Sequence, residues 1–333
     1  MRWFVGILIA LVLLLGGALW LLSAPDIPRA AMEAKYATPP SQFVDLVYDS
    51  TIPGATKPDT ARPSRVHYRA RGPANGPVLL LLHGSNASLF TWEPWSKMLS
   101  DHFRVISVDL PAHGLTGATA TGDYTQAGMA NFVLAFADKL GLKTFALAGN
   151  SMGGGVAARF AELHPDRVSA LILVDAGGLP SKKGDHPPLA FWLLRQAWLR
   201  PALAKLDPTP LVKEGLNDAI VHKEILTPRM IELYADMARM EGSRRATGDR
   251  FSQYAAATDW TYVRDHTAAL KMPVLILWGA EDHLIPVEMA GVWHKLLPGS
   301  KLIVYPHTGH IPMEEVAGPS AEDVRAFLAS HGM

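Results

Sequence analysis

The chain has 333 residues, its 31 Lys and Arg side chains balance 31 Asp and Glu side chains, and it contains no cysteine. Its length and apolar content are sufficient for a large core. Balanced charge argues against nucleic acid as a partner, and the lack of cysteine excludes disulfides, thiolate catalysis and cysteine-based metal sites.

The N-terminus carries a long apolar run. Residues 3–22 contain no charged side chain, and a helix of that length spans roughly 30 Å, the thickness of the hydrocarbon core of a bilayer. Trp3 and Trp20 lie near its two ends, where interfacial aromatic residues are favoured. We predict that residues 1–23 form an uncleaved transmembrane anchor. The alternative is a cleaved signal peptide, although Leu22-Ser23-Ala24 is a poor cleavage site.

The flanks of this run suggest an orientation. Arg2 precedes the run and Arg29 and Lys35 follow it, so the positive-inside rule gives only a weak preference. We place the N-terminus inside and the rest of the chain on the extracytoplasmic (periplasmic) side, whereas signal cleavage would give a secreted protein. The Pro-rich residues 24–42 predict a linker rather than a domain.

Short apolar runs predict strands from residue 43 onward. Residues 43–48 and 65–70 predict an antiparallel pair, and the residues at 51–63 between them, rich in Pro, Gly and Thr, predict a loop. Six further runs are typical of parallel strands that are buried on both faces. They are residues 78–82, 104–108, 144–148, 170–174, 274–278 and 301–305.

Helical patterns alternate with these strands. They include residues 126–140, 152–164 and 286–297. Such alternation predicts an α/β fold with a doubly wound, mostly parallel sheet and helices on both faces. Residues 179–260 contain helical patterns but no buried-strand run. We therefore predict a helical cap there, inserted between two parts of one core at residues 43–178 and 261–333.

The turn after the strand at 144–148 carries the first chemical motif. It reads Gly149-Asn150-Ser151-Met152-Gly153 and joins a strand to a helix, which is the context of a nucleophile elbow. The sharp turn exposes the Ser151 hydroxyl, the glycines leave room for crossing backbone, and the helix N-terminus favours developing negative charge. The motif predicts that Ser151 is a nucleophile, with an ordinary Gly-rich turn as the alternative.

Two histidines follow the last predicted strand, and a serine nucleophile needs a base. We predict that His310 is this base and that His307 is an ordinary loop residue. Their spacing is also compatible with a metal pair, but no carboxylate cluster of convincing ligand spacing accompanies them. Neither a metal nor a cofactor is therefore expected.

Acidic residues follow two of the predicted strands, at the carboxyl edge where open α/β sheets place their sites. Asp282 comes shortly after the strand at 274–278, and we predict that it orients the imidazole of His310. Asp175 follows the strand at 170–174 and is the alternative acid. Glu281 is expected to be a solvated loop carboxylate.

Backbone N–H groups are expected to bind the negative charge that forms when a carbonyl is attacked. Met152, the residue after Ser151, is one predicted donor to this oxyanion hole. The second is expected from the loop His83-Gly84-Ser85-Asn86, with Ser85 preferred and Asn86 as the alternative. His83 itself is expected to brace this loop.

These motifs resemble the α/β-hydrolase superfamily from about residue 43 to the end of the chain. The matching segments are LLLLHGS, RVISVDLPAHGLT, GNSMGG, LILWGAEDHLIP and GHIPMEE. The chain is similar to the capped branch that includes esterases and meta-cleavage-product hydrolases. The resemblance implies an eight-stranded sheet, a cap after the sixth strand, and Ser151, Asp282 and His310 as a catalytic triad. Ser151 argues against the relatives that use an aspartate nucleophile.

The expected activity is therefore cleavage of a carboxylic ester through an acyl-enzyme. A C–C or other non-ester hydrolase is the alternative, although Ser85-Asn86-Ala87 departs from the glycine-richer loop of C–C hydrolases. A non-catalytic, membrane-tethered binding protein of the same fold is the third possibility. Apolar cap residues such as Trp192 and Trp198 suit a small to medium apolar ester, whereas Arg195 would suit a substrate carboxylate.

Overall fold

The computed structural model describes residues 3–4, 17, 22–54, 62–179, 196, 198–254 and 260–333. Most of the predicted anchor, part of the loop at 51–63 and much of the first part of the predicted cap, including Trp192 and Arg195, lie outside these residues. Among the residues described, no helix is both long enough and apolar enough to cross a bilayer.

Eight strands form one sheet in the order β1-β2-β4-β3-β5-β6-β7-β8. β2 runs antiparallel to β1 and β4, and the other neighbouring strands are parallel. The strands are β1 (Ser41–Leu46), β2 (Ser64–Arg71), β3 (Val78–Leu82), β4 (Arg104–Val108), β5 (Phe145–Asn150), β6 (Val168–Val174), β7 (Val274–Gly279) and β8 (Lys301–Tyr305). The predicted mostly parallel α/β sheet is confirmed.

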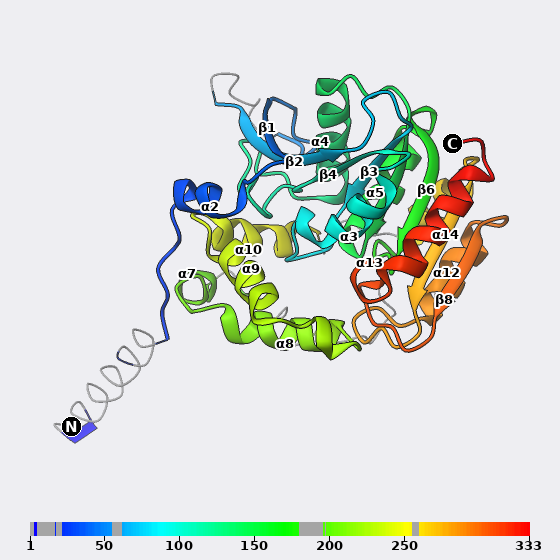
Figure 1. The fold of residues 1–333 in the computed structure, drawn as a ribbon. Coiled ribbons are helices and arrows are strands. Elements are labelled where there is room, and N and C mark those ends of the chain that lie inside the picture. Colours follow the sequence, from blue (N-terminus) through cyan, green and yellow to red (C-terminus); the bar gives the residue numbers. More distant parts are fainter. Residues whose placement is uncertain are drawn as a thin grey trace.

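Helices cover both faces of this sheet (Figure 1). Side chains of a strand alternate between faces, so the leucines of β3 serve two apolar clusters: Leu80 and Leu82 pack into one, Leu79 and Leu81 into the other. The first cluster also contains residues of α4 (Gln126–Lys139), α5 (Met152–Leu163) and α12 (Glu288–Leu296), and the second contains residues of α3 (Glu93–Leu99) and α14 (Ala317–Ala329).

The strand order reverses at the centre of the sheet. The chain passes from β3 to β4 on one side, and the next strand, β5, pairs with β3 on its other side. Connections that leave neighbouring parallel strands in opposite directions create a crevice at the carboxyl ends of those strands, where open α/β sheets bind their ligands. The loop after β3 and the turn after β5 both border this position.

The described residues between β6 and β7 contain helices and no strand of the sheet, which agrees with a helical insertion after the sixth strand. These helices are α7 (Arg200–Leu203), α8 (Thr209–Ala219), η3 (Lys223–Ile225), α9 (Pro228–Arg239), α10 (Ser243–Tyr254) and α11 (Trp260–Thr267). Figure 1 shows α8, α9 and α10 together along one side of the sheet. We call the helices α7 to α10 the cap.

The segment after the predicted anchor is ordered, which differs from the linker expected at residues 24–42. α2 (Arg29–Tyr36) buries Met32, which is 1% exposed, in an apolar cluster with residues of the cap. Just before it, the Ile27 N–H donates to the Arg239 carbonyl of α9 at 2.8 Å. Pro28 is the N-cap of α2, where a missing backbone donor costs little. The prolines that suggested a linker therefore accompany a docked helix.

Candidate active site

Ser151 occupies a strained turn between β5 and α5. Its φ of 53° and ψ of −121° lie in a region that side-chain-bearing residues rarely adopt, at a cost on the order of 1–3 kcal/mol. The flanking glycines are explained by crossing backbone. A Cβ added to Gly149 would lie 2.2 Å from the Gly153 oxygen, and one added to Gly153 would lie 2.3 Å from the Leu82 oxygen. The geometry is that of the predicted elbow.

The loop after β3 lies directly against this turn. A Cβ added to Gly84 would lie 2.8 Å from Asn150 Oδ1 and 3.1 Å from Ser151 Cβ. Ser85 and Asn86 follow in this loop, and Asn86 has a left-handed φ of 59°. The structure therefore brings the predicted oxyanion loop beside Ser151 and Met152.

His83 braces this loop, as expected for it. Its side chain is fully buried, Nδ1 donates to the Gly84 carbonyl at 2.8 Å, and Nε2 accepts from the Leu110 N–H at 3.0 Å. Burial lowers the pKa of His83, which favours the neutral ring that this pair of hydrogen bonds requires.

His310 and Asp282 form the expected pair. His310 Nδ1 lies 2.7 Å from Asp282 Oδ2, and both side chains are buried. The other carboxylate oxygen, Oδ1, accepts from the backbone N–H groups of Leu284 at 2.8 Å and Ile285 at 2.9 Å. These bonds fix the carboxylate, and the carboxylate fixes the imidazole with Nδ1 as its donor. Nε2 is then the ring atom that can accept a proton.

The rival residues take other positions. His307 is exposed and its Nδ1 lies 3.0 Å from Glu281 Oε1, so these two loop residues pair with each other. Asp175 lies close to the His310–Asp282 pair, since one ligand atom from each of the three residues falls within 4.8 Å of the others. Burial and the neighbouring Asp282 raise the pKa of Asp175 well above its usual range, which favours its neutral form.

The residue before the serine joins the two loops that carry Ser151 and His310, a role that was not anticipated from the sequence. Asn150 Nδ2 donates to the His310 carbonyl at 3.0 Å and to the Val174 carbonyl at 3.2 Å. The only indication of this role in the sequence was the position of Asn150 inside the GNSMG motif. Because both bonds are buried, they fix the histidine loop relative to the turn that carries Ser151.

The cap contacts the same histidine loop. The His310 N–H donates to the Ala219 carbonyl at the end of α8, at 2.8 Å. Glu315 accepts from the Gly309 N–H through Oε1 at 2.8 Å, and from the Val221 N–H through Oε2 at 2.7 Å. Glu315 belongs to the GHIPMEE segment, but its role could not be predicted from the sequence. Its carboxylate joins the cap to the loop that carries His310.

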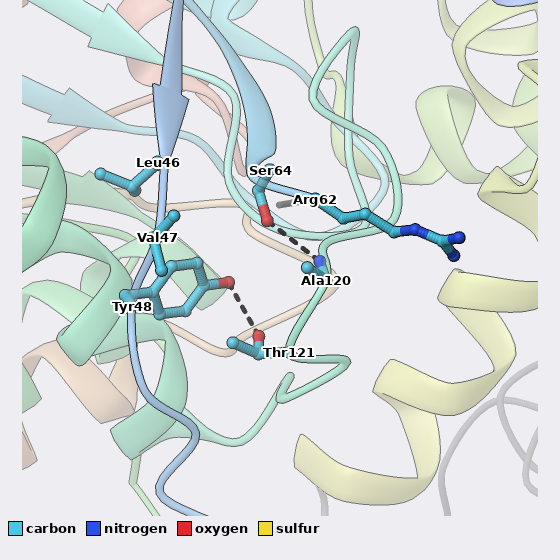
Figure 2. A pocket seen from close by; sticks show the side chains of 7 residues that line it. All are labelled: Leu46, Val47, Tyr48, Arg62, Ser64, Ala120 and Thr121. Carbon is cyan, nitrogen blue, oxygen red and sulfur yellow. Dashed lines mark hydrogen bonds between the residues drawn. The ribbon is translucent and has the colours of Figure 1, made fainter. Parts of the chain in front are cut away.

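A small surface pocket lies elsewhere (Figure 2). Four of its residues are hydrogen-bonded in pairs, because the Ala120 N–H donates to Ser64 Oγ and the Thr121 hydroxyl donates to the Tyr48 hydroxyl oxygen, both at 3.0 Å. It is lined by Leu46, Val47, Tyr48, Arg62, Ser64, Ala120 and Thr121. None of these residues belongs to the predicted triad or to the oxyanion loop.

A family model and several sequence relatives assign the chain to the same family. Residues 77–316 match the model of the alpha/beta hydrolase fold. An uncharacterised protein of Mycobacterium tuberculosis is 31% identical over 269 residues, which cover 76% of each chain. A 2-hydroxy-6-oxononadienedioate/2-hydroxy-6-oxononatrienedioate hydrolase of Burkholderia vietnamiensis is 28% identical over 300 residues, covering 86% of this chain and 95% of that protein.

A solved structure agrees with the sequence relatives. The malate-bound structure of a thermophilic esterase from Thermogutta terrifontis superposes with a TM-score of 0.70 and 25% identity, covering 88% of this chain and 100% of the esterase. The family match includes Ser151, Asp282 and His310 and spans most of the chain, and the sheet has the matching topology. This chain therefore belongs to the α/β-hydrolase family and is a hydrolase of that fold.

Proposed function

We propose that the protein is a serine hydrolase that cleaves a carboxylic ester through an acyl-enzyme. The observation that carries the proposal is the combination of an elbow at Ser151 with a 2.7 Å contact between His310 and Asp282. Serine alone is a weak nucleophile, and an oriented imidazole is what makes it reactive.

The proposed first half-reaction forms the acyl-enzyme. His310 Nε2 takes the proton of the Ser151 hydroxyl as Oγ attacks the ester carbonyl, and the carbonyl electron pair moves to oxygen. The backbone N–H groups of Met152 and Ser85 bind this oxyanion, with Asn86 as the alternative to Ser85. When the oxyanion collapses, the bond to the alcohol breaks and His310 returns the proton to the leaving alkoxide.

The second half-reaction repeats these steps with water. His310 removes a proton from water as the water oxygen attacks the acyl carbonyl, and the proton then passes to Ser151 Oγ as the ester bond to serine breaks. Asp282 stays ionised and stabilises the imidazolium throughout. All proton transfers use side chains of this chain, and the proposed reaction steps require neither a cofactor nor a metal.

The proposed substrate is a small to medium, largely apolar ester. The relationship to a structurally similar esterase supports an ester. A C–C or other non-ester hydrolase is the second candidate, favoured by the relative named as a 2-hydroxy-6-oxononadienedioate/2-hydroxy-6-oxononatrienedioate hydrolase. A panel of p-nitrophenyl esters of increasing acyl length, compared with such a dienedioate, separates the two. Faster turnover of the dienedioate than of every ester would reject the ester proposal.

The catalytic proposal is tested by labelling the full chain with a fluorophosphonate probe, which reacts with activated serines. We expect rapid labelling of the wild type, none of Ser151→Ala, and wild-type labelling of Ser100→Ala at the C-terminal end of α3. An unlabelled wild type would favour a non-catalytic binding protein of this fold. Labelling of Ser151→Ala at the wild-type rate would place the nucleophile elsewhere.

We also propose that residues 1–23 anchor the protein in a membrane, with the hydrolase on the extracytoplasmic side. The support is the length and apolar character of the run at 3–22. In intact cells the hydrolase domain should resist added protease. Once the outer envelope is made permeable while the cytoplasmic membrane is still intact, the protease should digest the domain. Protection until the cytoplasmic membrane is broken would reverse the orientation.

A further inference from the structure

Arg250 of α10 is a buried cation beside the proposed oxyanion hole. Its side chain is 2% exposed. Nη2 donates to Asn86 Oδ1 at 2.8 Å, and Nη1 lies 3.5 Å from Met152 Sδ, a weak acceptor. Asn86 and Met152 thus lie on the two sides of the proposed oxyanion hole, and the Arg250 guanidinium contacts both.

This cation has no carboxylate partner among the residues that the structure describes, and its Nε has no hydrogen-bond acceptor there. Arg69 provides the contrast, because it is also buried and its Nη1 pairs with Glu93 Oε1 at 2.7 Å. Buried charges are normally paired, since removing them from water is costly. Burial lowers the pKa of Arg250 to about 10, so the guanidinium is still charged at neutral pH.

The contacts of Arg250 fix groups whose placement matters for catalysis. Asn86 has a left-handed φ of 59°, a conformation that needs support from its surroundings. The bond from Arg250 to its side-chain oxygen supplies such support. One turn further along α10, the Tyr254 hydroxyl donates to the Met152 carbonyl at 3.3 Å. The helix therefore holds both the loop after β3 and the residue after Ser151.

We propose that Arg250 is a positioning residue of the oxyanion hole, which holds the Ser85–Asn86 loop against Met152 and stabilises the oxyanion with its unneutralised charge. The proposal rests on the serine-hydrolase function proposed above. An electron pair moves to the carbonyl oxygen when Ser151 attacks, so a full negative charge appears near a fixed positive charge. In a dry site such a preorganised interaction is strong, because no solvent has to reorganise.

An anionic group on the substrate is the other possible source of negative charge. Two of the three guanidinium nitrogens already contact protein atoms, and the side chain is almost fully buried. Both observations favour a role toward the reacting carbonyl over direct recognition of a substrate carboxylate. Neutral esters should therefore depend on Arg250 as strongly as acidic esters do.

The test compares full-length Arg250→Gln and Arg250→Lys with the wild type. Gln removes the charge and Lys keeps it, and neither is larger than arginine. For a neutral p-nitrophenyl ester, Arg250→Gln should lower kcat about 10²-fold with little change in KM, because the interaction is made mainly in the transition state. Arg250→Lys should recover part of this loss. Arg245→Met, an exposed position on the same helix, should leave kcat unchanged.

A trifluoromethyl ketone provides the second readout, because its adduct with Ser151 carries the oxyanion. Arg250→Gln should weaken this inhibitor by the same factor as kcat, which a merely structural role would not do. Circular dichroism checks folding, and where one variant does not fold the other is compared with the wild type. An unchanged kcat overturns the proposal, and so does a rise in KM confined to esters that carry a carboxylate. An inactive, unlabelled wild type would instead refute the underlying function.

Discussion

Among single residues, Ser151 shows how the fold maintains an unfavourable backbone conformation. Its N–H donates to the Val174 carbonyl at 3.0 Å and its carbonyl accepts from the Gly177 N–H at 2.8 Å, so both peptide groups are held by β6 and the turn after it. A strained conformation persists only where the surroundings determine it in this way. The chain thereby presents the proposed nucleophile without relying on the preferences of serine itself.

The two buried aspartates near His310 offer a direct comparison at this scale. Asp282→Asn should lower kcat about 10³- to 10⁴-fold, because the amide cannot hold the imidazole in the required tautomer. Asp175→Asn should leave kcat within about tenfold of the wild type, because burial and the neighbouring Asp282 favour the neutral carboxyl, which an amide resembles. Steady-state kinetics on the best ester measures both. If Asp175→Asn lowered kcat more than Asp282→Asn, Asp175 would have to be assigned as the acid that orients His310.

Among the elements, the junction between the cap and the core depends on the short helix α13 (Pro312–Glu315), which follows His310. Glu315 binds the backbone after α8, as described above. Glu314 accepts from the Thr91 hydroxyl in η1 (Leu89–Trp92) and, at 3.4 Å, from the Tyr234 hydroxyl in α9. Adjacent carboxyl groups therefore join three separate elements to the loop of the proposed base.

This junction should make stability depend on pH. Burial raises the pKa of Glu314 to about 7, above its value in the unfolded chain. The folded state then binds more protons than the unfolded state at pH values between about 4.5 and 7. The stabilising contribution of Glu314 is therefore present at low pH and is lost as the pH rises through this window. For one proton the slope is at most about 1.4 kcal/mol per pH unit.

Urea unfolding of the wild type and Glu314→Gln at pH 5 and pH 8 measures this contribution. From pH 5 to pH 8, the urea midpoint of the wild type should decrease more than that of Glu314→Gln, because the variant lacks the titrating group. Glu322→Gln, with an exposed side chain, serves as the control and should follow the wild type. Parallel pH profiles for the wild type and Glu314→Gln would show that Glu314 does not titrate as expected.

For the whole molecule, the docked N-terminal segment determines how the hydrolase would be held at a membrane. The Leu22 carbonyl accepts from the Asp207 N–H at 2.8 Å, and the Arg29 side chain donates to the Thr116 carbonyl at 3.0 Å. Residues 22–36 therefore bind both the cap and the core. If the run at 3–22 is an anchor, it leads directly into the cap without a free spacer.

Two truncations separate anchoring from docking. Removing residues 1–21 should move the activity to the soluble fraction with kcat and the thermal midpoint unchanged. Removing residues 1–36 should also lower the free energy of unfolding by about 2–5 kcal/mol, because it leaves a cavity where Met32 is buried. Fractionation and thermal unfolding measure the two effects. If the activity of the chain without residues 1–21 stayed in the membrane fraction, the anchor would be rejected. Equal thermal midpoints for the two truncations would reject a stabilising role for α2.

The sequence by itself determined the sheet and the chemistry of its loops. Continuous apolar strands such as Val78–Leu82 are recognisable because both faces of a parallel sheet are buried, and glycines such as Gly149 mark a turn that no side chain fits. Each proposed catalytic residue also lies in a loop just after a strand, so local order in the chain pointed to Ser151, to the loop of His310 and to two candidate acids.

Only the tertiary structure decided which distant groups meet. Asp175 and Asp282 both follow strands at the same edge, and their order in the chain could not show which of them contacts His310. Arg250 lies in a cap whose sequence pattern only indicated helices, and its two partners are 98 and 164 positions away. The docking of residues 24–36 was missed for the same reason. Such contacts depend on packing between elements, which local sequence patterns do not encode.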